Sequence, residues 1–533
     1  MIWCHRLTDR TRDFQSRNRS SILRGTTMQN YIEIGRISDI SNARDRLTYR
    51  LLEILPGFLS ITTLMFALVF SWSKPVWVAF FVIIFDVYWT LKVYYLSFYQ
   101  VVSFRKMKKN LKIDWGKEIK KYPESKNVYQ LVILPMAKEN WEVVNETLES
   151  LKNSIYPKDK MIVVLAQEQA GGEESREIGK MAEKYYGNCF HSFLITEHPS
   201  NVEGEVRGKG SNMAFAGKQV RKLIEQEQIP LRNIIVSAFD IDTKVYPQYF
   251  NRLVYCYLKA KRPERSSFQP IPVYHNNVWQ SKAFTRVVAA SNSFWQMMQQ
   301  EKPEQLVTYS SHSMSGEVFF NVGYPHNIVS DDSRIFWKAF LKYNGDYEVI
   351  PLYYPISMDV VMGENFLKTI INQYKQQKRW AWGVIEIPYV VFNFLKNERI
   401  PIKKKIFHTL VLLDGFWSWA CASLLIGFLG WLPIFFGGEA FNATVLSYKL
   451  PNITAIILTF SMVGMITGAL INILFLPPMP KNMKGVKKIF MILQWLFLPI
   501  TLIIFGAFPA LDAQIKLILG KDLEFWNTPK PRS

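Results

Sequence analysis

Five long apolar stretches, two near the start of this 533-residue chain and three near its end, limit the folds that it can adopt. A helix of about 20 apolar residues is long enough to cross a bilayer. The stretches are residues 54–72, 75–99, 406–436, 453–476 and 489–508. The sequence therefore predicts an integral membrane protein, with about two transmembrane helices before a polar middle and three after it.

Basic residues predict the orientation of these helices, because loops rich in Lys and Arg stay in the cytosol. Such residues gather in 1–50, 105–109, 403–405 and 481–488, whereas the loops between the opposite helix ends carry almost none. We therefore expect a multi-pass protein of the plasma (inner) membrane, with its middle domain in the cytosol and its C-terminus outside. The basic residues beside the apolar stretches also account for the net charge of +20, so we expect no binding to nucleic acid.

Composition divides the chain into seven regions. They are a basic tail (1–50), two transmembrane helices (51–100), a basic linker on the membrane surface (101–128), a polar middle domain (129–363), amphipathic interfacial helices (364–404), three transmembrane helices (405–510) and a C-terminal tail (511–533). The Arg- and Ser-rich stretch before Met28 has no apolar core, so it is not a secretory signal. It is either a disordered tail or sequence upstream of a true start at Met28.

Short apolar runs alternate with helical patterns through the first half of the middle domain. A strand opens into a loop over 130–140, and further strand-like runs occupy 161–165, 190–195 and 234–236. Between them, helical periodicity covers 141–151, 175–186 and 211–225. This alternation predicts a parallel, doubly wound α/β sheet.

Asp240 and Asp242 follow the last of these runs, one residue apart. Ligands collect at the carboxyl ends of parallel strands, and two carboxylates placed there repel each other unless a cation lies between them. Hard oxygen ligands suit Mg²⁺ or Mn²⁺. The pair therefore indicates a divalent-metal site, and a polar turn that closes the strand is the simpler alternative.

A Gly-rich loop, Gly204-Glu-Val-Arg-Gly-Lys-Gly210, precedes the helical segment 211–225. Its glycines permit close approach of a backbone, Arg207 and Lys209 supply positive charge, and a helix begins right after it. This combination can cradle a phosphate or diphosphate. The alternative is an ordinary Gly-rich loop with solvated basic side chains.

Asp331 and Asp332 stand immediately before a predicted helix, 333–343. Capping of that helix is the simpler role for an aspartate at this place. Two adjacent carboxylates exceed what a cap requires, so one of them could act as general base toward a hydroxyl group.

The last polar element is a predicted helix over 365–383. Gln376 and Arg379 share one of its faces, and Trp380 adjoins that face. Arg379 offers a planar fork to phosphate oxygens, and the indole offers a flat surface to a sugar ring. A basic amphipathic helix that lies on the membrane would explain the same residues.

In this order and between apolar helices, the motifs resemble those of the membrane-embedded family 2 glycosyltransferases of the processive type, the cellulose, chitin and hyaluronan synthases. The resemblance covers roughly residues 50–510. It rests on Pro135 to Glu139, the Gly-Lys-Gly loop, Asp240-Ile-Asp242, Asp331-Asp332 and Gln376-x-x-Arg379-Trp380. It implies a nucleotide-sugar-binding domain of the glycosyltransferase A type, with a mixed, mostly parallel sheet, inserted between the transmembrane helices.

The resemblance also implies a role for each residue. These roles are contact with the nucleotide (Glu139, Lys209), binding near nucleotide and metal (Asp240), ligation of Mg²⁺ or Mn²⁺ (Asp242), deprotonation of the acceptor hydroxyl (Asp332, with Asp331 beside it), and binding of donor diphosphate and acceptor sugar (Gln376, Arg379, Trp380). Two positions depart from the family pattern. Glu168 ends the second strand where the family has an Asp pair for base and ribose, and Ser330 precedes the acid pair in place of a longer acidic triplet.

The activity that the resemblance implies is transfer of a sugar from a nucleoside-diphosphate sugar to a growing polysaccharide, with export as a possible second step. A single displacement with one base should invert the anomeric centre. Single transfer to a membrane lipid is the alternative, because five helices are few for a channel, and a partner subunit could complete one. A non-catalytic sugar-binding scaffold is a third interpretation, which the intact carboxylates disfavour. Asp86 and Asp414, inside apolar stretches, could line a polar path or lie near helix ends.

Overall fold

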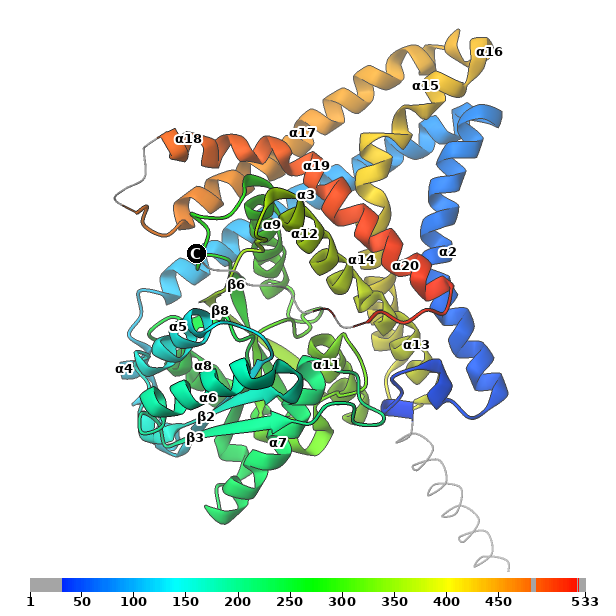
Figure 1. The fold of residues 1–533 in the computed structure, drawn as a ribbon. Coiled ribbons are helices and arrows are strands. Elements are labelled where there is room, and N and C mark those ends of the chain that lie inside the picture. Colours follow the sequence, from blue (N-terminus) through cyan, green and yellow to red (C-terminus); the bar gives the residue numbers. More distant parts are fainter. Residues whose placement is uncertain (1–30, 481–485, 525, 527–533) are drawn as a thin grey trace, which may run out of the picture.

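A mixed sheet of eight strands forms the centre of the computed structural model, which describes residues 31–480, 486–524 and 526 (Figure 1). In chain order the strands are β1 (Tyr129–Met136), β2 (Met161–Glu168), β3 (Ser192–His198), β4 (Ile234–Ala238), β5 (Lys244–Val245), β6 (Ser266–Val273), β7 (His312–Ser315) and β8 (Glu348–Ser357). Their order in space is β3-β2-β1-β4-β7-β6-β8-β5. The basic tail before residue 31, including Met28, and the basic positions 481–485 lie outside the described residues.

The predicted parallel, doubly wound arrangement holds for one half of this sheet, whereas the other half combines parallel and antiparallel pairs, in agreement with the mixed sheet that the resemblance implies. Strands β3, β2, β1 and β4 are parallel neighbours. Strand β7 then pairs antiparallel with both β4 and β6, and β5 pairs antiparallel with β8. No apolar run marks this half in the sequence, because β6 contains two prolines and β7 is His-Ser-Met-Ser. The domain is therefore a mixed α/β sheet.

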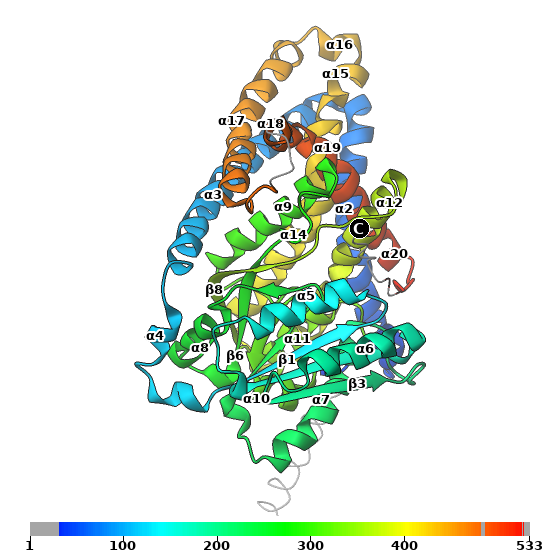
Figure 2. The same cartoon turned by 60° about the vertical axis from the view of Figure 1, so that its left-hand side comes forward.

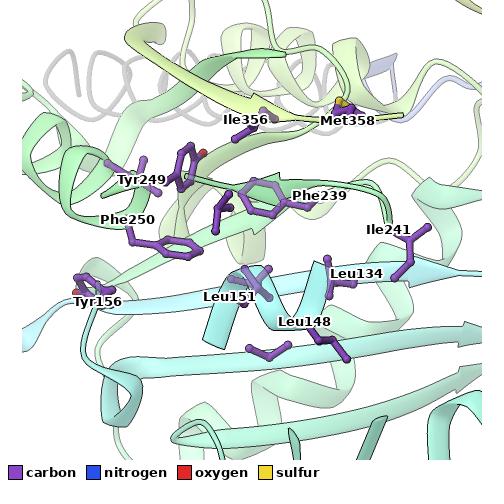
Figure 3. Close-up of a cluster of buried hydrophobic side chains, with 14 of the residues drawn as sticks. Leu134, Leu148, Leu151, Tyr156, Phe239, Ile241, Tyr249, Phe250, Ile356 and Met358 are labelled. Carbon is purple, nitrogen blue, oxygen red and sulfur yellow. The ribbon is translucent and has the colours of Figure 1, made fainter. Parts of the chain in front are cut away.

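Side chains of β1 fill the space on both faces of the sheet. Leu134 packs in a buried cluster with Leu148 and Leu151 of α5 (Trp141–Lys152) and with Phe250, as Figure 3 shows. Ile133 belongs to the cluster on the opposite face. Successive side chains of a strand point to opposite faces, so one continuous apolar run serves both clusters. Each fully buried aliphatic side chain contributes about 1.5–3 kcal/mol.

Within the described part of the chain, five helices are long and apolar enough to cross a membrane, judged by length and composition. They are α2 (Ala43–Ser73), α3 (Pro75–Asn110), α14 (Ile402–Gly427), α17 (Val445–Phe475) and the broken helix Ile489–Ile518. They lie to one side of the sheet (Figures 1 and 2). Each overlaps a predicted stretch, in agreement with the expected membrane protein. The bounds differ in places: α3 continues into the expected surface linker, and the last helix runs into the expected tail.

Two helices lie between the sheet and the apolar helices (Figure 2). They are α9 (Ala283–Gln300) and α12 (Phe366–Ala381), and α12 corresponds to the helix predicted over 365–383. Lys378 of α12 forms an ion pair with Asp512 of α20 (Phe508–Ile518), with 2.6 Å between Nζ and Oδ2. The domain that carries the candidate motifs is therefore packed directly against the apolar helices.

Trp526, the last residue that the structure describes, does not lie where the basic residues predict. Trp526 lies beside Lys375 of α12, with 5.3 Å between Nζ and the ring centroid, and so on the same side of the apolar helices as the middle domain. The prediction of a C-terminus on the opposite side is wrong for this residue. Both parts of the broken helix contact that domain, because Gln494 accepts a hydrogen bond from Arg286 of α9 and Asp512 pairs with α12. The orientation predicted from Lys and Arg in the loops holds only if every apolar stretch crosses the bilayer once.

Candidate active site

One cavity of about 2100 Å³ lies at the carboxyl ends of β1, β2 and β4. All nine residues singled out from the sequence line it: Glu139, Lys209, Asp240, Asp242, Asp331, Asp332, Gln376, Arg379 and Trp380. They come from five separate segments of the chain, so the fold brings together groups that are far apart in sequence. Their chemical roles remain predictions.

Lys209 joins two of the predicted carboxylates. It is the first residue of α7 (Lys209–Gln226), and its Nζ lies 2.8 Å from Oδ1 of Asp240 and 2.8 Å from Oδ1 of Asp332. It also donates a hydrogen bond to the carbonyl oxygen of Ser310 at 3.0 Å. Burial lowers the pKa of Lys209, but the charges of Asp240 and Asp332 outweigh it and the net shift is upward. Lys209 is therefore a permanent cation between the two carboxylates.

Asp240 is held by the segment that leads into β7. Ser310 donates to its Oδ2 at 2.7 Å, and the hydroxyl of Ser311 accepts the backbone N–H of Asp240 at 2.9 Å. Ser310 has a φ of +49°, a left-handed conformation that costs free energy in a residue with a Cβ atom. Such strain is often found where a side chain must be held in one direction, and here the hydroxyl of Ser310 is directed toward Asp240. No motif in the sequence indicated a role for Ser310.

Asp242, two residues after Asp240, is buried. Its Oδ2 accepts the backbone N–H of Asp359 at 3.1 Å. Asn276 donates both to the carbonyl oxygen of Asp242, at 2.8 Å, and to Oδ1 of Asp359, at 2.9 Å. Asp359 lies two residues after the end of β8 and lines the same cavity, so it is a second carboxylate beside Asp242 that sequence reasoning missed. Its strand belongs to the half of the sheet that the sequence did not reveal.

Asp331 and Asp332 form the first turn of α11 (Asp331–Lys342). The helix begins two residues earlier than predicted, so neither carboxylate caps it from outside. Burial and the charge of Asp332 raise the pKa of Asp331 well above its ordinary value. Burial also raises the pKa of Asp332, while the charge of Lys209 opposes the rise. The pKa of Asp331 is therefore raised further than that of Asp332, which leaves Asp332 as the more readily ionised carboxyl of the pair.

Two further side chains contact Asp332. Tyr324 donates to its Oδ1 at 3.3 Å, and Nδ1 of His312 lies 3.9 Å from the same atom. Burial and the charge of Lys209 lower the pKa of His312 to about 3, so this imidazole is neutral at neutral pH. His312 therefore does not compete with Lys209 as a counter-ion of Asp332. Nothing in the spacing of the sequence marked Tyr324 as part of the site.

Helix α12 supplies the remaining candidate groups. Gln376 accepts a hydrogen bond from Gln373 at 3.3 Å, and Trp380 is partly buried against the core of the sheet domain. The guanidinium of Arg379 lowers the pKa of both Asp331 and Asp332 and is thus electrostatically coupled to them. On the opposite wall, Oε2 of Glu139 accepts the backbone N–H groups of Ala137 and Lys138 at 2.7 and 3.1 Å, which shapes the loop after β1.

The cavity continues into the apolar helices. Trp89 and Lys92 of α3 and Asp414 of α14 line it there. Lys92 Nζ lies 2.8 Å from Oδ2 of Asp414 and 3.1 Å from the hydroxyl of Ser418. The two carboxylates noted in the apolar stretches therefore differ: Asp414 faces the cavity, whereas Asp86 is buried, 1% exposed.

The residues present fit a divalent cation. No group of three or more His, Cys, Asp or Glu side chains with metal-ligand geometry occurs among the described residues. Mg²⁺ and Mn²⁺ are commonly held by one or two protein carboxylates together with phosphate oxygens of the substrate. Asp242, with Asp359 beside it and Asp240 nearby in sequence, supplies a donor set of that kind. A site completed by substrate phosphates is consistent with the presence of these carboxylates and with the lack of a three-ligand cluster among the described residues.

No protein-family model and no curated protein sequence matches this chain. Among solved structures, the chain is similar to the mannosyltransferase PcManGT from Pyrobaculum calidifontis in complex with GDP-Man and Mn²⁺. The identity is 15% over 73% of this chain and 98% of that chain, with a TM-score of 0.42. It is also similar to TarS 1–349 from S. aureus in complex with UDP-GlcNAc, at 14% identity over 65% and 91% of the two chains and a TM-score of 0.34. At these TM-scores the likeness carries no argument about function.

Proposed function

We propose that the protein is a membrane-embedded glycosyltransferase that transfers a sugar from a nucleoside-diphosphate sugar to an acceptor hydroxyl. The observation that carries the proposal is the cavity in which Lys209 bridges Asp240 and Asp332, with Asp242 and Arg379 on the same walls. A sugar transfer from a diphosphate needs a positive environment for the leaving group and a base for the incoming hydroxyl. Residues suited to both tasks line one cavity, which supports the proposal.

In this proposal each group acts through its position. Arg379, Gln376 and Lys209 bind the diphosphate, and the charge that develops on the leaving group is offset by the two cations. Bound at Asp242, Mg²⁺ or Mn²⁺ would supply further neutralisation of the diphosphate. Asp332 takes the proton of the acceptor hydroxyl at its carboxylate oxygen, Asp331 stays protonated beside it, and Trp380 offers a face to the acceptor sugar. One displacement with one base inverts the anomeric centre.

Two acceptors fit the shape of the cavity. A growing polysaccharide would leave the carboxylates along the polar wall formed by Lys92, Asp414 and Ser418, which could lead toward export. A membrane lipid could reach the same carboxylates from the bilayer, because α3, α14 and α17 supply the wall on that side. The basic flanks of the apolar helices support a cytosolic sheet domain and a plasma (inner) membrane location.

Turnover of radiolabelled nucleotide sugars by the full-length protein in detergent tests the proposal. Asp332→Asn and Asp242→Asn should each lower turnover by about 10²-fold or more, because they remove the base and the metal ligand. Asn372→Ala, on α12 and the cavity wall but without a proposed role, serves as the matched control. A polymer product supports the synthase and a single addition supports lipid glycosylation. No turnover with any nucleotide sugar would overturn the proposal.

A further inference from the structure

A histidine between two glutamates lies beside the cavity, away from the residues used above. His198 is the last residue of β3 and is 4% exposed. Its Nδ1 lies 3.2 Å from Oε2 of Glu168, and its Nε2 lies 2.8 Å from Oε2 of Glu205. Glu168 ends the neighbouring strand β2, and Glu205 belongs to the Gly-rich loop. One imidazole ring therefore joins the sheet edge to the loop that precedes Lys209.

Both ring nitrogens of His198 contact a glutamate, so one buried ring fixes the side chains of Glu168 and Glu205 at the same time. The charged groups that face this cluster are Glu168, Glu205 and Arg207, the last of which acts on Glu168 from the same loop.

Glu168 offers one oxygen to a ligand. The side chain is 6% exposed and lines the cavity, as does Arg207. Its Oε2 contacts His198, whereas its Oε1 is buried and has no hydrogen-bond partner among the described residues. A buried carboxylate oxygen without a partner is costly, which is why such atoms usually bind a ligand or water. The end of β2 is also where an open α/β sheet receives the nucleoside part of a nucleotide.

We propose that His198 is a positioning residue for the nucleoside of the donor: it holds Glu168 so that Oε1 accepts a hydrogen bond from the ribose or the base, and it ties this contact to the Gly-rich loop. The inference rests on the proposed function, since it takes the donor to be a nucleoside diphosphate sugar.

Titration calorimetry on the full-length protein tests this role with three ligands: UDP, GDP and inorganic pyrophosphate, each with Mn²⁺. His198→Ala should lower the affinity for the preferred nucleoside diphosphate by about tenfold or more, which is equivalent to the loss of one hydrogen bond to a charged group. His198→Gln can still donate to one glutamate, so it should recover part of the loss. Pyrophosphate, which has no nucleoside, should bind all proteins alike. The same titration with a 2′-deoxynucleoside diphosphate distinguishes a contact with the ribose from a contact with the base.

The chain offers a matched control in His191, which precedes the same strand. Its Nε2 lies 2.7 Å from Oε2 of Glu227, but this pair lies outside the cavity wall. His191→Gln should leave all affinities unchanged.

The possible outcomes separate the two proposals. If the parent protein binds neither nucleoside diphosphate, the proposed function fails and this inference fails with it. If the parent protein binds one of them and both His198 variants, each shown to be folded by its thermal transition, bind it equally well, only the positioning role is overturned. Equal loss of pyrophosphate binding in both variants would likewise overturn it, because the effect would not belong to the nucleoside.

Discussion

Lys209 is shared between two carboxylates that are proposed to have different tasks. Its Nζ lies at the same distance, 2.8 Å, from Asp240 and from Asp332. In the free protein its charge opposes the rise that burial causes in the pKa of Asp332. An arriving diphosphate would bring negative charge toward the same cation, which would weaken the hold of Lys209 on Asp332 and make that carboxylate more basic. Donor binding would therefore prepare the base.

Lys209→Met should move the acid limb of the kcat/KM profile to higher pH. The charge of Lys209 lowers the pKa of Asp332 against the effect of burial, so its removal lets that pKa rise. More of Asp332 is then protonated at neutral pH, and turnover should fall by about 10²-fold there. Lys209→Arg keeps the charge and should keep the position of the limb. A limb that stays in place in Lys209→Met would show that Asp332 is not the titrating base.

Asp331→Asn should stabilise the protein at neutral pH. The folded pKa of Asp331 is raised by burial and by Asp332, whereas an unfolded aspartate ionises near pH 4. The stability that the protonated group contributes is complete below that unfolded pKa and is lost as pH rises through the folded pKa. Asparagine has no charge to bury, so Tm in detergent should exceed that of the parent by about 2 °C or more at pH 7. The gain should shrink at acid pH, and a lower Tm at pH 7 would contradict the assignment.

At the scale of elements, two helix N-termini meet at the site. Helix α7 begins at Lys209 and α11 begins at Asp331, so both positive helix ends face the cavity. Gly210 makes this approach possible, because a Cβ atom there would overlap the carbonyl oxygen of Pro325 and come within 2.9 Å of Cβ of Asp331. The glycine is thus a condition for the contact between Lys209 and Asp332.

Gly210→Ala should separate the two helix ends. Backbone atoms of the segment before α11 cannot yield as a flexible side chain can, so overpacking should cost about 1–3 kcal/mol. Turnover should fall together with nucleoside diphosphate affinity, because Lys209 and Asp332 lose their spacing. Gly217→Ala, on the same helix, meets only the ring of Phe319 and controls for loss of stability. If both variants lose stability equally and keep turnover, the approach of the helices does not matter for the reaction.

The sequence predicted those elements whose pattern is local and left out those that depend on partners. β1, β2 and β4 are apolar runs buried on both faces, so their type and order could be read directly. β7 is a four-residue polar strand that exists because β4 and β6 flank it, and Asp359 could not be placed without β8. Short motifs found Asp242, Asp332 and Arg379, whereas Ser310 and Tyr324 contribute through contacts that no spacing records.

At the scale of the whole molecule, the sheet domain and the apolar helices enclose one continuous space. Helices α9 and α12 lie between them, and the broken helix Ile489–Ile518 contacts both (Figures 1 and 2). The cavity therefore runs from Asp332 to Lys92 and Asp414 without leaving the protein. A polar pair inside apolar helices is costly unless it serves a ligand or a path. This continuity connects the proposed chemistry to an acceptor in or across the membrane.

Lys92→Met should impair the acceptor side of the reaction and spare the donor side. Lys92 and Asp414 are far along the cavity from Asp242, so nucleoside diphosphate affinity measured by calorimetry should be unchanged. Transfer to the acceptor should fall by about tenfold, the effect of one hydrogen bond to a charged group. Removal of one partner also leaves Asp414 unpaired at the cavity wall, so Lys92→Met combined with Asp414→Leu should recover Tm without recovering transfer. Lys74→Met, an exposed lysine at the start of the same helix, should change neither quantity. A matching loss of donor affinity in Lys92→Met would show that this end of the cavity belongs to the donor instead.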